Sequence, residues 1–148
     1  MNIETLQKLS KEYTDKGLYR GNFESLSVTT YRQIDYANNV LLVESEEDAE
    51  DEVLMIYAIH EEATRCLYWP MESVSKYVGA IKLSDFPVKD FLALYKTHFR
   101  GSKIFNHIDT GKIDTIYSFS SPAYDDWCGE LFIKTGEKKY ALMWDYCD

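Results

Sequence analysis

Residues 131–146 read LFIKTGEKKYALMWDY, two apolar stretches separated by a short loop. Gly136 and Glu137 form the loop, and a glycine in the first position of a two-residue loop favours a type II′ turn between antiparallel strands. This turn fixes which side chains face each other, and the apolar positions of the two stretches then agree. The expected pairs are Leu131 with Leu142 and Ile133 with Tyr140.

Further strands are expected along the chain. Alternate positions in residues 26–36 are mostly apolar, which is typical of a half-buried strand. Asn38 and Asn39 can adopt the positive φ angles of a tight turn, which would pair Ile34 with Val43 and Tyr36 with Leu41. Residues 53–60 form an uninterrupted apolar run, which indicates a central strand buried on both faces. The remaining predictions are a turn at 61–64 and strands at 65–69, 103–108 and 112–119.

Three helices are expected as well. The first begins after Asn2, a capping residue, and shows apolar side chains at helical spacing until Gly17. The second runs from Pro70 to Gly79. The third has Ser84 or Asp85 as its cap, Pro87 in its first turn, an apolar stripe through residues 91–99, and Gly101 at its end. Together these elements predict a single α+β domain over residues 1–148, an antiparallel sheet with an N-terminal helix and two central helices packed on it.

The charge of the chain is concentrated in one segment. There are 25 acidic and 16 basic residues, and seven of the acids lie within residues 44–52, so the rest of the chain is nearly neutral. Like charges this close repel one another and resist burial, which predicts a solvated loop between two sheet strands. The segment lacks the glycine and the alternating ligands of a calcium loop. The seven acids are Glu44, Glu46, Glu47, Asp48, Glu50, Asp51 and Glu52.

Composition and motifs exclude several classes of function. The acidic balance disfavours direct binding to nucleic acid or to an anionic membrane. No apolar run approaches the ~20 residues of a membrane span, and three widely spaced cysteines do not form a disulfide framework, so a cytoplasmic location is expected. His60 begins a zinc-protease-like motif, but Thr64 replaces the second histidine. No catalytic residue, metal site or cofactor is predicted, and the chain is expected not to be an enzyme.

A second candidate segment is 121–127, which mixes two aromatic residues with two carboxylates. Tyrosine and tryptophan are favoured at the centres of protein interfaces, and flanking acids suit a basic partner. The alternative is that Trp127 fills the edge of the core. The candidate partner-binding residues of this segment are Tyr124, Asp125, Asp126 and Trp127.

These observations predict a stoichiometric protein-binding inhibitor whose acidic surface occludes a basic, nucleic-acid-acting target, as a toxin immunity protein or a phage or mobile-element anti-defence protein would. Two alternatives remain open. One is a small enzyme or ligand-binding domain in which His60, Cys66, His98 or His107 converge in a pocket. The other is a structural subunit of a larger assembly.

Overall fold

A computed structural model of the protein describes residues 1–15, 27–34, 38–46, 48–65, 71–97, 103–120 and 128–146. The described part of the chain contains six strands, four α-helices and two short 3₁₀ helices. In chain order they are α1 (Ile3–Asp15), β1 (Val28–Ile34), β2 (Asn38–Glu46), α2 (Asp51–Arg65), α3 (Met71–Gly79), β3 (Lys82–Asp85), α4 (Val88–Thr97), η2 (Lys103–His107), η3 (Thr110–Lys112), β4 (Ile113–Ser120), β5 (Cys128–Thr135) and β6 (Lys138–Tyr146).

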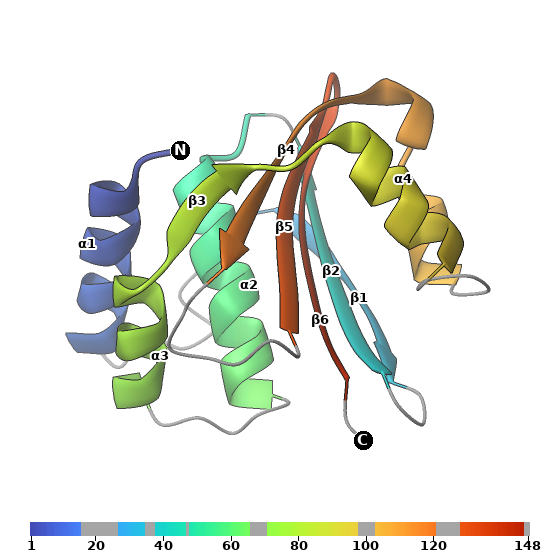
Figure 1. Cartoon of the computed structure of the whole chain (residues 1–148). Coiled ribbons are helices and arrows are strands. Elements are labelled where there is room, and N and C mark those ends of the chain that lie inside the picture. Colours follow the sequence, from blue (N-terminus) through green and yellow to red (C-terminus); the bar gives the residue numbers. More distant parts are fainter. Residues whose placement is uncertain are drawn as a thin grey trace.

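The strands form one sheet in the order β1-β2-β6-β5-β4-β3, and every neighbouring pair is antiparallel. Helices cover both faces of this sheet (Figure 1). The α1, α2 and α3 helices lie on one face, called here the α2 face, and α4 with η2 lies on the other, called the α4 face. The fold is therefore α+β, as the sequence predicts.

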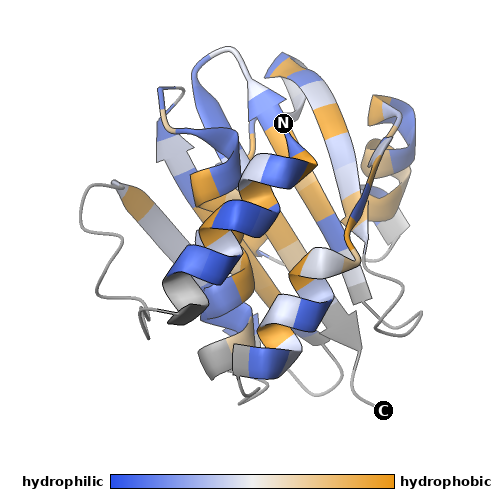
Figure 2. Cartoon of the chain, turned by 90° about the vertical axis from the view of Figure 1, so that its left-hand side faces the viewer, coloured by the Kyte–Doolittle hydropathy of each residue, from blue (hydrophilic) through white to orange (hydrophobic). Residues whose placement is uncertain are grey.

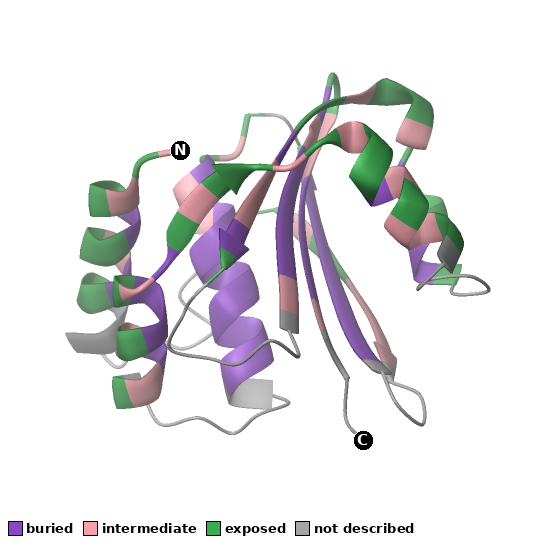
Figure 3. Ribbon diagram, in the orientation of Figure 1, coloured by how far each residue is buried: buried purple, intermediate pink, exposed green. Residues whose placement is uncertain are grey.

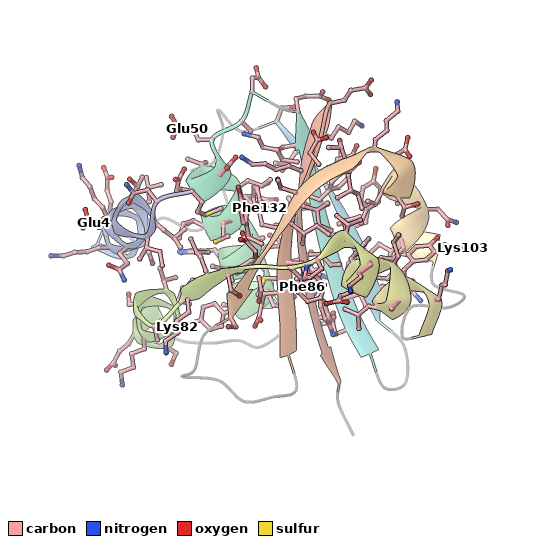
Figure 4. All side chains as sticks on the ribbon, turned by 45° about the horizontal axis from the view of Figure 1, so that its top comes forward. Glu4, Glu50, Lys82, Phe86, Lys103 and Phe132 are labelled. Carbon is pink, nitrogen blue, oxygen red and sulfur yellow. The ribbon has the colours of Figure 1, made fainter. Side chains whose placement is uncertain are left out.

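The central strands are apolar on both sides because both faces are covered. On β2, Leu41 and Val43 belong to the core under α2, whereas Val40 and Leu42 belong to the core under α4. The α2 helix is buried along most of its length, whereas α1 turns a polar surface to solvent (Figures 2 and 3). Figure 4 shows Phe132 between α2 and the sheet.

Several predicted elements are confirmed. The β5–β6 hairpin has the predicted register, with Leu131 opposite Leu142 and Ile133 opposite Tyr140. The first helix starts as expected, because Asn2 Oδ1 accepts a hydrogen bond from the backbone N–H of Thr5 at 3.2 Å. The α3 helix matches the predicted helix ending at Gly79, and β4 matches the predicted strand at 112–119 within one residue.

The predicted central strand at 53–60 is wrong, because this segment is the middle of helix α2. A continuous apolar run has no periodicity, so it fits a helix buried on all sides as well as a strand buried on both faces. Asp51 and Glu52 in the first turn favour the helix, since carboxylates stabilise helix N-termini. The predicted turn at 61–64 is part of the same helix, and Arg65, placed at the start of a further strand, is its last residue.

The predicted pairing of the first hairpin is also wrong. Val43 lies opposite Thr30 rather than Ile34, and Leu41 lies opposite Arg32 rather than Tyr36. Asn38 and Asn39 belong to β2, so the connection precedes them. The error amounts to four positions, an even number, and a slip by an even number keeps each side chain on its predicted face.

Two local predictions around α4 need correction. Residues 103–108 form the 3₁₀ helix η2 rather than a strand, and they contribute Ile104 and Phe105 to the core. Ser84 and Asp85 lie in β3, a short edge strand, so they do not cap the following helix. The α4 helix begins at Val88, directly after Pro87, whose carbonyl accepts hydrogen bonds from the backbone of Asp90 and Phe91. Gly101 and the predicted strand residues 66–69 lie outside the described residues.

Candidate functional site: the acidic end of the sheet

The acidic segment 44–52 joins a strand to a helix. Glu44 and Glu46 belong to β2, Asp51 and Glu52 belong to the first turn of α2, and the connection lies between them. This corrects the prediction of a loop between two strands. The connection lies at the same end of the sheet as the β5–β6 turn and η3, at the top of Figure 1. We call this region the acidic sheet end.

Asp51 is turned inward and held by two lysines. It is 8% exposed, and its carboxylate oxygens lie 2.6 Å from Lys134 Nζ and 2.7 Å from Lys139 Nζ. Lys139 Nζ also donates to the backbone carbonyl of Ala49 at 2.5 Å. Burial by itself raises the pKa of Asp51, but the hydrogen bonds and charges of the two lysines outweigh it and hold that pKa below its usual value. These contacts fasten the start of α2 to β5 and β6.

Glu44 is turned inward on the opposite face of the sheet. It is 8% exposed, forms an ion pair with Lys138, and accepts a hydrogen bond from the hydroxyl of Tyr31 at 3.0 Å. The hydrogen bond from Lys138 to Glu44 raises the pKa of Lys138. Burial, together with the hydrogen bond to Glu44, raises the pKa of Tyr31. The charge of Glu44 is thus balanced by Lys138, and its contacts join β1, β2 and β6.

The other described acids of the segment differ in their exposure. Glu52 is half-buried and accepts a hydrogen bond from the backbone N–H of Asn2 at 2.7 Å, which ties the N-terminal segment to α2. Glu46, Asp48 and Glu50 are exposed, and we call them the outward carboxylates. Glu50 projects from the connection in Figure 4.

A surface hollow of about 790 Å³ opens among the exposed charges of the acidic sheet end. The β5–β6 turn contributes Glu137 to its wall, and that carboxylate lies 3.8 Å from Lys112 Nζ of η3. The hollow thus has three carboxylates and one lysine in its lining, and that lysine is already paired with Glu44. An anionic hollow with this balance attracts cationic groups. Its lining residues are Glu46, Asp48, Gly136, Glu137 and Lys138.

The described residues bring together only part of the predicted site. Glu44, Glu46, Asp48, Glu50, Asp51 and Glu52 all lie at the acidic sheet end, but they separate into inward and outward sets. Glu47 lies outside the described residues, and so does the whole segment 121–127 with Tyr124, Asp125, Asp126 and Trp127.

The histidines of the alternative prediction lie apart. His60 is buried in α2 on one face of the sheet, and burial lowers its pKa to about 4. His107 is exposed at the end of η2 on the other face, where its ring stacks on Tyr31. Cys66 and His98 lie outside the described residues.

Sequence reasoning missed the inward role of Asp51, although a signal for it exists. The predicted register of the last hairpin sets Lys134 directly opposite Lys139. Like charges at directly opposed positions are destabilising, so a carboxylate close to this pair is favoured. The acidic segment supplies it as Asp51, although nothing in the sequence places that segment beside the last hairpin.

The described part of the chain contains no group of three or more His, Cys, Asp or Glu side chains placed to hold a metal ion. None of its helices is both long enough and apolar enough to span a bilayer.

Comparisons with known proteins give no relative. Models of known protein families, curated protein sequences and solved structures were each compared with the chain, and no match was found in any of the three.

Proposed function

We propose that this protein is a stoichiometric inhibitor that binds a basic, nucleic-acid-acting protein through the acidic sheet end. The observation that supports the proposal best is the hollow, where two of the outward carboxylates and Glu137 converge from β2, the β2–α2 connection and the β5–β6 turn. Residues from three separate segments form one anionic surface on the ordered end of a sheet. The partner would be neutralised by occlusion of its basic cleft.

The inward contacts support this proposal because they hold both ends of the connection between β2 and α2. Lys139 holds both Asp51 and the carbonyl of Ala49, and Lys138 holds Glu44. The outward carboxylates are therefore attached to a connection whose ends are fixed before a partner arrives. A surface that needs no ordering on binding loses less conformational entropy in the complex.

Charge also explains why the partner would be basic. The outward carboxylates and Glu137 are exposed, so they retain their hydration until a cationic surface replaces it. Complementary charge raises association rates by about 10- to 1000-fold over the neutral case, and the gain falls steeply with salt. Nucleases and other nucleic-acid-binding proteins have basic clefts of the required kind.

The proposal is tested with two variants of equal charge. The first, called here the outward-neutral variant, combines four substitutions that each remove one exposed negative charge. The second is a matched control with four exposed carboxylates removed elsewhere on the surface. The outward-neutral variant combines Glu46→Gln, Asp48→Asn, Glu50→Gln and Glu137→Gln, and the control combines Glu4→Gln, Asp85→Asn, Asp90→Asn and Asp114→Asn.

Wild-type protein and both variants are immobilised and exposed to lysate of the source cells, and the retained proteins are quantified by mass spectrometry. We expect a basic protein retained by the wild type and the control but released by the outward-neutral variant. The purified partner should lose its nucleic-acid activity on addition of one equivalent of the wild type. Equal retention by all three proteins, or a partner whose activity is unaffected, contradicts the proposal.

A further inference from the structure

An exposed aromatic stack lies beside the acidic sheet end on the α4 face. The rings of Tyr31 and His107 are 3.7 Å apart between centroids and only 16° from parallel. Tyr31 belongs to β1 and is half-buried, whereas His107 ends η2 and is exposed. Tyr31 covers one face of the imidazole, and His107 as a whole residue is exposed.

Two tyrosines connect this stack to Glu44. The hydroxyl of Tyr31 donates to Glu44, and the hydroxyl of Tyr140 donates to the backbone carbonyl of His107 at 3.0 Å. Tyr140 also lies directly opposite Glu44 in the β2–β6 register. His107 is therefore held in place by two hydrogen-bonded side chains of the sheet.

Glu44 in turn connects the stack to the hollow. It pairs with Lys138, which lines the hollow, and Glu46 in the same lining lies two residues farther along β2. Two residues of a strand span about 7 Å. Glu44 thus contacts one residue of each feature, Tyr31 of the stack and Lys138 of the hollow.

We propose that an arginine of the basic partner stacks on His107 while neighbouring cationic residues of the same segment occupy the hollow. This inference rests on the proposed function and adds the chemical identity of the anchoring residue. A guanidinium is planar and weakly hydrated, so it stacks on aromatic rings, whereas the ammonium of lysine is a compact and strongly hydrated charge. The carboxylates at the hollow attract either cation, and the stack adds to the preference for arginine.

The test compares two fluorescein-labelled peptides on the same glycine–serine backbone, one with four arginines and one with four lysines. Fluorescence anisotropy at low salt gives the affinity of each peptide for the folded full-length protein. For the wild type we expect the arginine peptide to bind about two- to fivefold tighter, the effect of one exposed cation–aromatic contact. His107→Ala should reduce this preference, because only the carboxylates then favour arginine, and His107→Tyr should retain it because a ring is kept.

The outcomes separate the two proposals. The outward-neutral variant should weaken both peptides together and leave their affinity ratio unchanged. If the ratio in His107→Ala equals that of the wild type, the arginine anchor is wrong while the inhibitor proposal stands. If the outward-neutral variant binds both peptides as well as the wild type does, or the wild type binds neither, both proposals fail. Circular dichroism confirms that each variant is folded.

Discussion

Glu44 and Asp51 differ from Glu46, Asp48 and Glu50 in burial and in pairing, although all five lie within eight residues. The first two are buried and paired with lysines of β5 and β6. The other three are exposed, and two of them line a surface hollow. Glu44 and Glu46 share one face of β2, so it is the position of Glu46 at the end of the strand, and that of Asp51 in the first turn of α2, that separates the two sets. Clustered charge in a sequence thus gives no information about the role of its individual members.

The comparison also separates two uses of a carboxylate. An inward carboxylate stabilises the fold by pairing with a lysine of β5 or β6, most strongly at Asp51, whose two lysines are themselves mostly buried. An outward carboxylate has little effect on the fold and is available to a partner. Substitutions in the two sets should therefore affect different measurements.

The largest effect is expected from Asp51→Ala. This substitution leaves Lys134 and Lys139, two mostly buried cations at opposed strand positions, without their shared carboxylate. Removing one partner of a buried ion pair typically costs about 4 kcal/mol. Urea unfolding should show this loss, and Asp48→Asn in the same segment is the control that should leave the midpoint unchanged. Equal midpoints for the two variants would show that Asp51 does not act as an inward residue.

The next largest effect is a pH dependence of the free energy of unfolding, which arises from the buried His60. Burial lowers the pKa of His60 to about 4, whereas the unfolded chain binds that proton near the ordinary value of 6.5. The free energy of unfolding should therefore fall by about 3 kcal/mol as the pH drops from 6.5 to 4, and this contribution should be constant below that range. Urea titrations of the wild type and of His60→Leu should differ in slope across this window.

Asp51 affects the free energy of unfolding at lower pH than His60 does. Its folded-state pKa is depressed, so its contribution to stability is present above the ordinary pKa of 3.8 and is lost as the pH falls through the lower folded value. For His60, a free energy of wild-type unfolding that stays constant between pH 6.5 and 4 would contradict the predicted effect of its burial.

A smaller effect is expected from Glu44→Gln. The amide can still accept the hydrogen bond of Tyr31, but it loses the charge attraction of Lys138, whose side chain is 39% exposed. Because solvent screens a lysine this exposed, the expected loss is about 1 kcal/mol. Thermal unfolding measures it, with Glu46→Gln on the same strand as the matched control. A loss of stability as large as that of Asp51→Ala would mean that the fold depends on Glu44 as much as on Asp51.

The smallest effect on stability is expected from neutralising the outward carboxylates together, as Glu46→Gln, Asp48→Asn and Glu50→Gln. Exposed substitutions usually change stability by less than about 0.5 kcal/mol, and the relief of mutual repulsion favours a slight gain. Differential scanning calorimetry should give a melting temperature equal to or slightly above that of the wild type. A clear decrease would place these carboxylates in the inward set.

The sequence predicts this fold best where pairing is local. The β5–β6 register follows from Gly136 and the apolar pattern on either side of it, both within sixteen residues. Prediction from the sequence fails at α2, where burial on all sides removes the periodicity that distinguishes a helix from a strand. Prediction of the β1–β2 register also fails, because Asn38 and Asn39, the expected turn residues, belong to strand β2 instead.

The sequence shows where the carboxylates cluster but not how each of them is placed. Local charge density located the acidic sheet end, because clustered carboxylates are visible in the sequence itself. The inward contacts of Glu44 and Asp51 join residues about ninety positions apart, and no local pattern specifies such a contact. The Tyr31–His107 stack was missed for the same reason, since it depends on how η2 packs against β1.

The position of β6 between β2 and β5 has a consequence for the order of biosynthesis. Every residue of β2 pairs with a residue about a hundred positions later, so the middle of the sheet is assembled from early and late parts of the chain. While the ribosome is still translating residues 138–146, β2 has an open edge and α2 lacks the strand that holds Asp51. The sheet therefore cannot close between β2 and β5 until residues 138–146 have left the exit tunnel, and the unpaired edge of β2 is open to wrong pairing until then.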